Sequence, residues 1–160
     1  MLDEKGNEVK SGLGGWLILV GVGIVLGPLI MLSHLNSYLT IFNDGSYEML
    51  TTPGGAAYTP FFGIFLWGEI LFNGLFFCAS LYLIFLFFLK KKLFPKLYIY
   101  VLLGLLIFVI IDSLIAKQIF PNEPLFDAET TKTLIRTSLS SIIWVPYMLI
   151  SKRVKATFIK

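Results

Sequence analysis

The sequence is poor in the side chains that metalloenzymes and cysteine enzymes need. It contains one cysteine, Cys78, and one histidine, His34. A single cysteine cannot form an intrachain disulfide, and the two residues together offer too few soft ligands for a zinc or iron site. The spacings HExxH, CxxC, GxSxG and the P-loop pattern are also missing from the chain. We therefore expect no metal, no cofactor and no enzymatic activity.

Charged residues are scarce as well. They make up 14% of the 160 residues, whereas hydrophobic residues make up 56% and aromatic residues 16%. The mean hydropathy is +0.81, and soluble domains usually carry about 25% charged residues. No charged or proline-rich linker divides the chain. The composition predicts a single integral membrane domain over residues 1–160.

Four apolar segments approach the length that crosses a bilayer, which is about 20 residues in a helix. The first is too long for a signal peptide, and the stretch before it is acidic as well as basic. The pattern predicts an all-α membrane protein in which four transmembrane helices form one bundle. The expected spans cover residues 13–35, 61–89, 97–119 and 134–150.

The basic residues gather beside alternate ends of these spans. Because Lys and Arg close to a span are retained in the cytoplasm, both termini and the middle connection are predicted to be cytoplasmic. The three clusters are Lys5 and Lys10, then Lys90, Lys91, Lys92 and Lys96, then Lys152, Arg153, Lys155 and Lys160.

The same clusters indicate which partners to expect. They lie beside apolar runs and lack the interleaved aromatic residues of a nucleic-acid groove, so we expect no nucleic-acid partner. We expect contact with the bilayer, and with a membrane protein partner or further copies of the chain. Anionic lipid headgroups are expected at Lys90, Lys91, Lys92, Lys152 and Arg153.

Two carboxyl side chains, Glu69 and Asp112, lie inside the predicted spans. Ionisable groups are costly in the hydrocarbon, so they usually face the bundle interior and mark functional positions. At about 1.5 Å per residue, Glu69 lies about 12 Å from Phe61 and Asp112 about 10 Å from Ile119. Both distances start from the outer end of a span, so the two carboxyls are expected at one depth.

Three interpretations fit a polar cluster at that depth. In the first, Arg136 and His34 neutralise the carboxyls in a structural clamp, with Asn73 one turn from Glu69 on the same helix face. In the second, the two carboxyls share a proton or capture a cation. In the third, they carry out hydrolytic or transfer chemistry at the membrane surface.

Two further features are expected to serve helix packing. Gly23 and Gly27 have the small-xxx-small spacing that lets two membrane helices approach closely. Trp144 lies in the fourth span, away from its ends, so it is expected near the middle of the membrane and packed inside the bundle.

Three motifs resemble a known family. The stretches GLGGWL, YTPFFGIFLWGEILFN and WVPYMLISKRVKATF together resemble the YdgK-like family of bacterial membrane proteins of unknown function. The resemblance implies a small four-helix protein of the bacterial inner membrane and no particular substrate. Besides Glu69 and Asn73, the motif positions are Trp16, Tyr58, Pro60, Trp144, Pro146, Tyr147, Ser151, Arg153 and Val154.

Two functions follow as hypotheses. The first is a non-enzymatic accessory, assembly or regulatory component of a larger membrane system. The alternative is a small proton-coupled or cation-coupled transporter that uses Glu69 and Asp112. Co-purification with a complex would indicate the first, and stability that depends on pH or ions through the carboxyl pair would indicate the second.

Overall fold

The computed structural model describes residues 11–160, apart from the side chains of His34 and Leu35, and within this range the chain forms only helices. Four helices are long and apolar enough to cross a membrane, as predicted. The basic residues Lys5 and Lys10 lie outside the described residues. The long helices are α1 (Trp16–Asn43), α3 (Phe62–Phe88), α4 (Phe94–Ile119) and α5 (Ala128–Ile150), and the short ones are α2 (Ser46–Thr51) and α6 (Lys152–Thr157).

Helices α1 and α5 extend furthest beyond the spans that the sequence predicts. Helix α1 continues past residue 35 to Asn43, where the chain still carries the apolar side chains of LTIF. Helix α5 begins at Ala128 because Asp127 caps it, accepting a hydrogen bond from the Thr130 amide at 2.6 Å. The first turns of α5 are polar, so a search for apolar segments does not detect them although they are helical.

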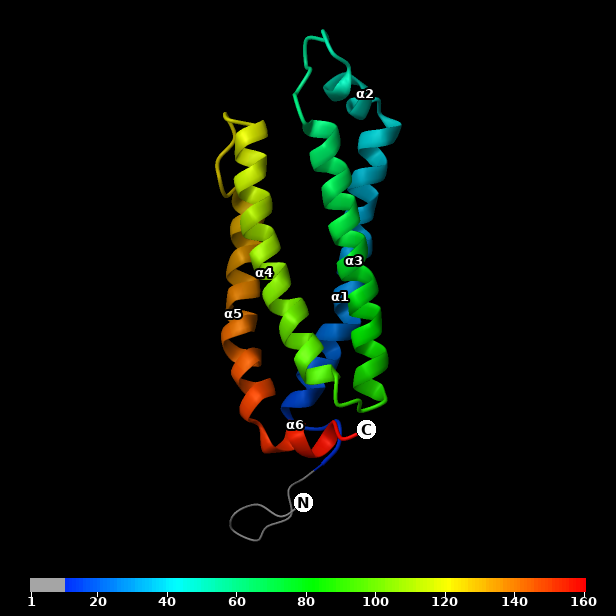
Figure 1. Cartoon of the computed structure of the whole chain (residues 1–160), viewed down its shortest axis with the longest axis vertical. Coiled ribbons are helices and arrows are strands. Elements are labelled where there is room, and N and C mark those ends of the chain that lie inside the picture. The colour runs from blue at the N-terminus through cyan, green and yellow to red at the C-terminus, as the bar shows by residue number, and fades with distance from the viewer. Residues whose placement is uncertain (1–10) are drawn as a thin grey trace.

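The long helices pack in a row. Helix α3 lies between α1 and α4, and α4 lies between α3 and α5. Figure 1 shows the α1–α3 pair and the α4–α5 pair converging at the end that carries α6, and separating towards the other end. The bundle is therefore most tightly packed at the end with α6 and more open at the other, where Phe62 and Phe120 still contact each other with ring centroids 6.0 Å apart.

The hydrophobic core lies at the converging end. Phe94 is fully buried and stacks on Phe158, with ring centroids 4.6 Å apart, while Phe87 contacts both rings. Close packing of these rings joins the C-terminal segment to α3 and α4. The other buried members of this cluster are Leu17, Val20, Ile24, Leu83, Leu86, Met148 and Val154.

The N-terminal and C-terminal segments also bind each other at this end. The Gly12 amide donates to the Thr157 hydroxyl at 2.9 Å, and the Gly12 carbonyl accepts from Arg153 Nε at 3.3 Å. The last residue joins the α3–α4 connection, because the Lys92 amide donates to the Lys160 carbonyl at 2.7 Å. Helix α6 thus forms a floor across the bundle.

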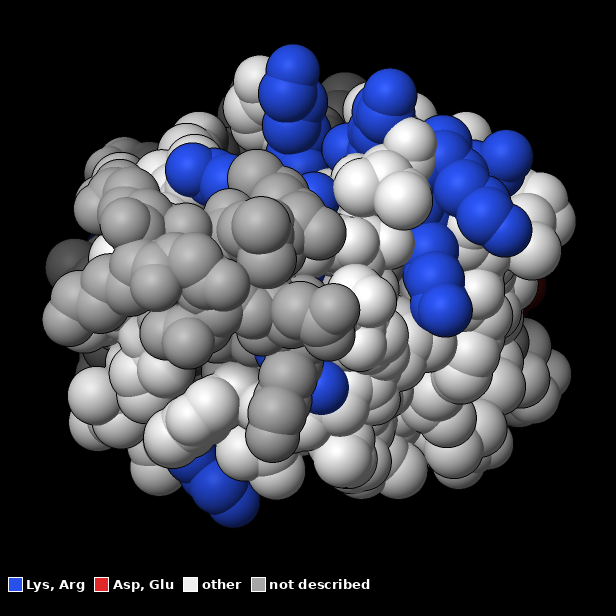
Figure 2. All heavy atoms as spheres, turned by 90° about the horizontal axis from the view of Figure 1, so that it is seen from below, with Lys and Arg blue, Asp and Glu red and all other residues white. Residues whose placement is uncertain are grey.

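The floor is surrounded by positive charge. Figure 2 looks onto this end and shows Lys and Arg side chains spread around its rim. Figure 1 places the C-terminus and the start of the described chain at the same end. We call it the basic end, defined by Lys90, Lys91, Lys92, Lys152 and Lys155. Its cytoplasmic orientation stays a prediction from the charge pattern.

Candidate functional site

The carboxyl groups of Glu69 and Asp112 face each other between α3 and α4. Each side chain lies within hydrogen-bonding reach of the other and is partly buried. Measured along their helices, Glu69 lies about 10 Å from Phe62 and Asp112 about 10 Å from Ile119. Packing α3 against α4 in antiparallel fashion brings these equal depths together. The structure therefore joins the two carboxyls that the sequence places at one depth.

The pair opens into a cavity between α3 and α4. Its volume is about 460 Å³, and apart from the two carboxyls its lining is almost entirely apolar. Phe72 and Phe108 contact each other with ring centroids 5.0 Å apart, about one turn towards the basic end from the carboxyls. Phe76 adds a second contact to Phe108 at 5.8 Å. These rings line the cavity on the side of the carboxyl pair that faces the basic end.

Asn73 and Tyr38 extend the polar cluster to a third helix. The Asn73 side-chain amide donates to the Tyr38 hydroxyl at 3.0 Å and to the Glu69 backbone carbonyl at 2.9 Å. Tyr38 comes from α1 and lies close enough to Glu69 and Asp112 to be affected by their charges. The cluster therefore joins α1, α3 and α4 in the open half of the bundle.

Sequence reasoning did not include Tyr38. Tyrosine is common near membrane interfaces, so its identity alone gives no signal. The predicted first span also stopped at residue 35, which left Tyr38 in a loop. Only the continuation of α1 to Asn43 brings its hydroxyl to Asn73.

Arg136 and His34 complete the list of predicted cluster members. Arg136 lies on α5 and lines a different cavity from the one that holds the carboxyls. Among the side chains that the structure describes, Asp112 is the charged neighbour of Glu69, and Arg136 does not reach either carboxyl. The side chain of His34 lies outside the described residues. The structure thus groups Glu69, Asp112 and Asn73, and places Arg136 apart.

The cavity beside Arg136 lies between all four long helices, and we call it the central cavity. Its volume is about 400 Å³. Gly23 and Gly27 form part of its wall on α1, and a Cβ at either position would meet nothing within 4 Å. The expected helix contact at Gly23 and Gly27 is therefore wrong. The close approach occurs instead at Gly21, where a Cβ would lie 3.0 Å from the Phe87 ring.

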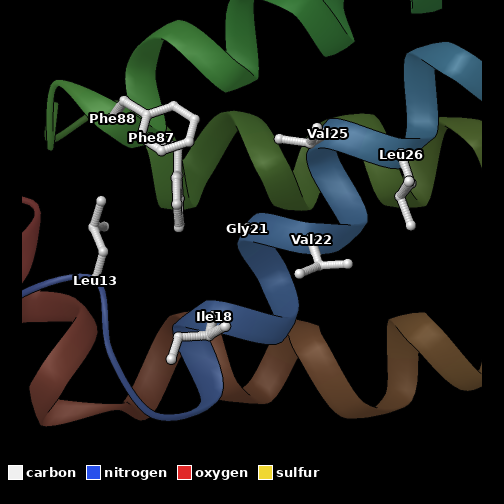
Figure 3. A pocket seen from close by; sticks show the side chains of 8 residues that line it. All are labelled: Leu13, Ile18, Gly21, Val22, Val25, Leu26, Phe87 and Phe88. Atoms are coloured by element: carbon white, nitrogen blue, oxygen red, sulfur yellow. The ribbon is translucent and has the colours of Figure 1, made fainter.

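A third pocket lies between the start of α1 and the end of α3. Figure 3 shows its side chains, which are all hydrocarbon. Its volume is about 370 Å³, and without a polar group it offers no chemistry beyond contact with lipid tails. Its lining consists of Leu13, Ile18, Gly21, Val22, Val25, Leu26, Phe87 and Phe88.

Comparison with known proteins identifies the family. The model of a family described as a protein of unknown function (DUF2569) matches residues 10–159. The chain belongs to this family. It is 30% identical over 154 residues to the inner membrane protein YdgK of Escherichia coli (strain K12), covering 92% of this chain and 93% of that relative. No solved structure matches. Together with the four spans, this relative supports a multi-pass location in the bacterial inner membrane.

Most positions in the family motifs meet at the basic end. Trp16 begins α1 and contacts Trp144 edge to face at 6.3 Å, while Trp144 also contacts Tyr147 at 5.8 Å. Trp144 is partly buried and packs against the core cluster, which confirms that it lies inside the bundle, while its depth in the membrane stays a prediction. Pro146 on the same helix is exposed.

The C-terminal motif folds into the floor. The Ser151 hydroxyl caps α6 by accepting from the Val154 amide at 3.4 Å, and Val154 is buried beneath the bundle. Arg153 is partly buried against the GLGG segment. The first and last family motifs therefore pack against each other through Arg153 and the GLGG segment.

The middle motif lies at the opposite end. Tyr58 and Pro60 line an open pocket there, which is shared with Tyr47 and Trp67. The Trp67 indole donates to the Tyr47 hydroxyl at 3.3 Å, which holds α2 against α3. Glu69 follows Trp67 on the same helix, so this motif both packs the α1–α3 connection against α3 and supplies one carboxyl of the pair.

Proposed function

We propose that this protein is a non-enzymatic inner-membrane protein that takes up a proton, exchangeable for a small cation, at the Glu69–Asp112 pair. The observation that carries the proposal is the direct juxtaposition of the two carboxyls between α3 and α4. Two carboxylates this close repel each other strongly in a low dielectric, and one shared proton or one bound cation removes that repulsion.

The position of Arg136 supports this reading over the structural clamp. A clamp needs a basic partner beside the carboxyls, and Arg136 lines the central cavity instead. Asn73 is occupied by Tyr38 and the Glu69 backbone, so its amide nitrogen holds the helices together without neutralising charge. Among the side chains that the structure describes, none brings a positive charge to the pair, and a proton or cation from outside the helices would supply it.

Proton uptake at this place would couple to helix packing. With one proton, the two carboxyls form a hydrogen bond that joins α3 to α4. Without the proton, repulsion acts between the same helices at the end where the bundle is already open. The contact between α3 and α4 would thus have two states, one with the proton and one without. A proton-coupled or cation-coupled transporter requires such a change between two conformations.

Thermal unfolding across pH tests the proposal. In mild detergent without metal cations, the parent should lose stability in one pH step as the shared proton leaves, and added cation should reduce the loss. Glu69→Gln should remove this step, whereas Glu123→Gln, which changes an exposed carboxyl, should keep it. Identical pH profiles for the parent and Glu69→Gln would refute the proposal.

The open arrangement of the helices favours a second candidate, an accessory or assembly role. Helices α1 and α5 lie at the two ends of the row, with α3 and α4 between them. Helices α1 and α5 therefore each keep a face that no other long helix covers. A further copy of the chain or another membrane protein could pack there. Anionic lipids would then contact the exposed Lys92 and Lys152, while Lys90, Lys91 and Arg153 are partly buried.

Purification in native-like lipid particles separates the two candidates. A stable complex with another membrane protein, retained in Glu69→Gln, would support the accessory role. A chain that purifies alone and shows the pH step would support the carboxyl-pair function.

A further inference from the structure

The central cavity has a polar end and an apolar end. On α5, Thr133, Arg136, Thr137 and Ser140 line it, and their spacing of three and four residues puts them on one helix face. Asn73 faces the same region from α3. Among the described residues that line the cavity there is no Asp or Glu, so Arg136 brings a positive charge without a negative one beside it. The polar groups lie in the half of the bundle away from the basic end.

Towards the basic end the lining becomes largely apolar. Side chains from three helices form this part, including Val20 and Ile24 of α1 and Leu83 of α3. Gly23 and Gly27 keep the α1 wall free of side chains, which leaves room that a larger residue would fill. The total volume of about 400 Å³ lies within the range of small-molecule sites, about 300 to 1,000 Å³.

We propose that the central cavity binds a long-chain fatty acid, with its carboxylate at Arg136 and its acyl chain along the apolar wall towards Leu83. Arg136 is exposed beside the cavity in the first half of α5, where its guanidinium attracts an anion, and a carboxylate matches its two-pronged geometry. The hydroxyls of Thr133, Thr137 and Ser140 line the same end and can donate hydrogen bonds.

Charge and size select this ligand among amphiphiles. Of the described lining residues, Arg136 is the one cation, which suits a ligand with a single negative charge, whereas a phosphate monoester carries about −1.5 to −2. A cavity of this volume suits one acyl chain. The ligand can enter from the membrane between α1 and α5, which are not closely packed along their length. The site is separate from the Glu69–Asp112 pair and does not depend on its function.

Equilibrium binding of radiolabelled palmitate to the full chain in non-ionic detergent tests the proposal. The methyl ester of palmitate is the matched neutral ligand. The parent should bind palmitate at least about 10-fold more tightly than the ester, because only the acid carries the charge that Arg136 recognises. Equal affinities in the parent would overturn the proposal without any variant.

Two variants and one control locate the site. Arg136→Gln should abolish the preference for the acid over the ester. Gly27→Leu should weaken binding of both ligands about 10-fold or more, because the new side chain enters the cavity where a Cβ meets nothing within 4 Å. Gly74→Leu is the matched control, since Gly74 on α3 is equally open but does not line the central cavity.

Binding that survives Gly27→Leu and falls in Gly74→Leu would overturn the location. A lysophospholipid carrying a phosphate monoester that binds more tightly than palmitate would overturn the choice of a carboxylate. Helical circular dichroism matching the parent confirms that each variant has folded before its affinity is compared.

Discussion

The guanidinium of Arg153 lies directly against the backbone of Gly14. A Cβ at Gly14 would lie 2.5 Å from Arg153 Nη2, and one at Gly15 would lie 3.0 Å from Nη1. The two glycines of GLGG are therefore the surface on which the arginine of the C-terminal motif rests. This contact, together with the bond from Arg153 Nε to the Gly12 carbonyl, fixes the floor of the bundle to the start of α1.

Gly15 should not tolerate a side chain. Its φ of +59° and ψ of −136° lie in a region that residues with a Cβ rarely adopt, and the guanidinium leaves no space. Gly15→Ala should lower the free energy of unfolding by about 1 to 3 kcal/mol, measured by chemical denaturation in mixed micelles. Gly68→Ala, at an open position in α3, is the control and should change stability little. Equal effects would show that the Arg153 contact has no energetic role.

Arg153→Lys should separate charge from packing. Lysine keeps the positive charge that sets membrane orientation but cannot reproduce the planar contact with Gly14 and the bond to Gly12. We expect unchanged topology in a reporter-fusion assay and a lower melting temperature. Unchanged stability would mean that the motif acts as a topology signal alone.

Phe158 should be a core residue although it lies two positions from the C-terminus. It is 5% exposed and packs on Phe94 and Phe87. Phe158→Ala should cost about 3 to 5 kcal/mol in denaturant unfolding because it opens a cavity among three rings. Its neighbour Ile159 is 59% exposed, and Ile159→Ala should stay within about 0.5 kcal/mol of the parent. Similar costs for the two would contradict the described floor.

Asp127 should make the start of α5 sensitive to acid. Hydrogen bonds from Thr130 lower the pKa of Asp127 below its usual value. A lowered pKa in the folded state means that the cap stabilises the helix above the unfolded-state pKa and is lost as pH falls through the folded-state pKa. Hydrogen exchange at the first turn of α5 should therefore accelerate in acid. Asp127→Asn keeps a capping oxygen without titrating, so its exchange should show no such acceleration.

The four helices could be predicted from the sequence because each is a long apolar segment, and segments of that length and composition are typical of membrane-spanning helices. The sequence also placed Glu69 and Asp112 at one depth, since distance along a helix follows directly from residue number. Which helices are neighbours does not follow from depth. For that reason the sequence could not place Arg136 in a separate cavity or bring Tyr38 to Asn73.

The glycines illustrate the same limit. Gly21, Gly23 and Gly27 look alike as small residues on one helix, yet only Gly21 meets another helix. The difference depends on the rotation of α1 relative to α3 and on the separation of the two helix pairs, and both are properties of the assembled bundle. The contact of Trp144 with Trp16 likewise depends on how α5 packs beside the start of α1, which residue number does not give.

The central claim is that Glu69 and Asp112 hold one proton between them. Infrared spectroscopy of the protein in lipid bilayers tests it directly, because a protonated carboxylic acid absorbs apart from carboxylates and shifts in deuterated buffer. At neutral pH without metal cations, the parent should show this band. Glu123→Gln should retain the band, and its intensity or frequency should change in both Glu69→Gln and Asp112→Asn. A parent spectrum without a protonated carboxyl, or a band unaffected by either substitution in the pair, would contradict the account.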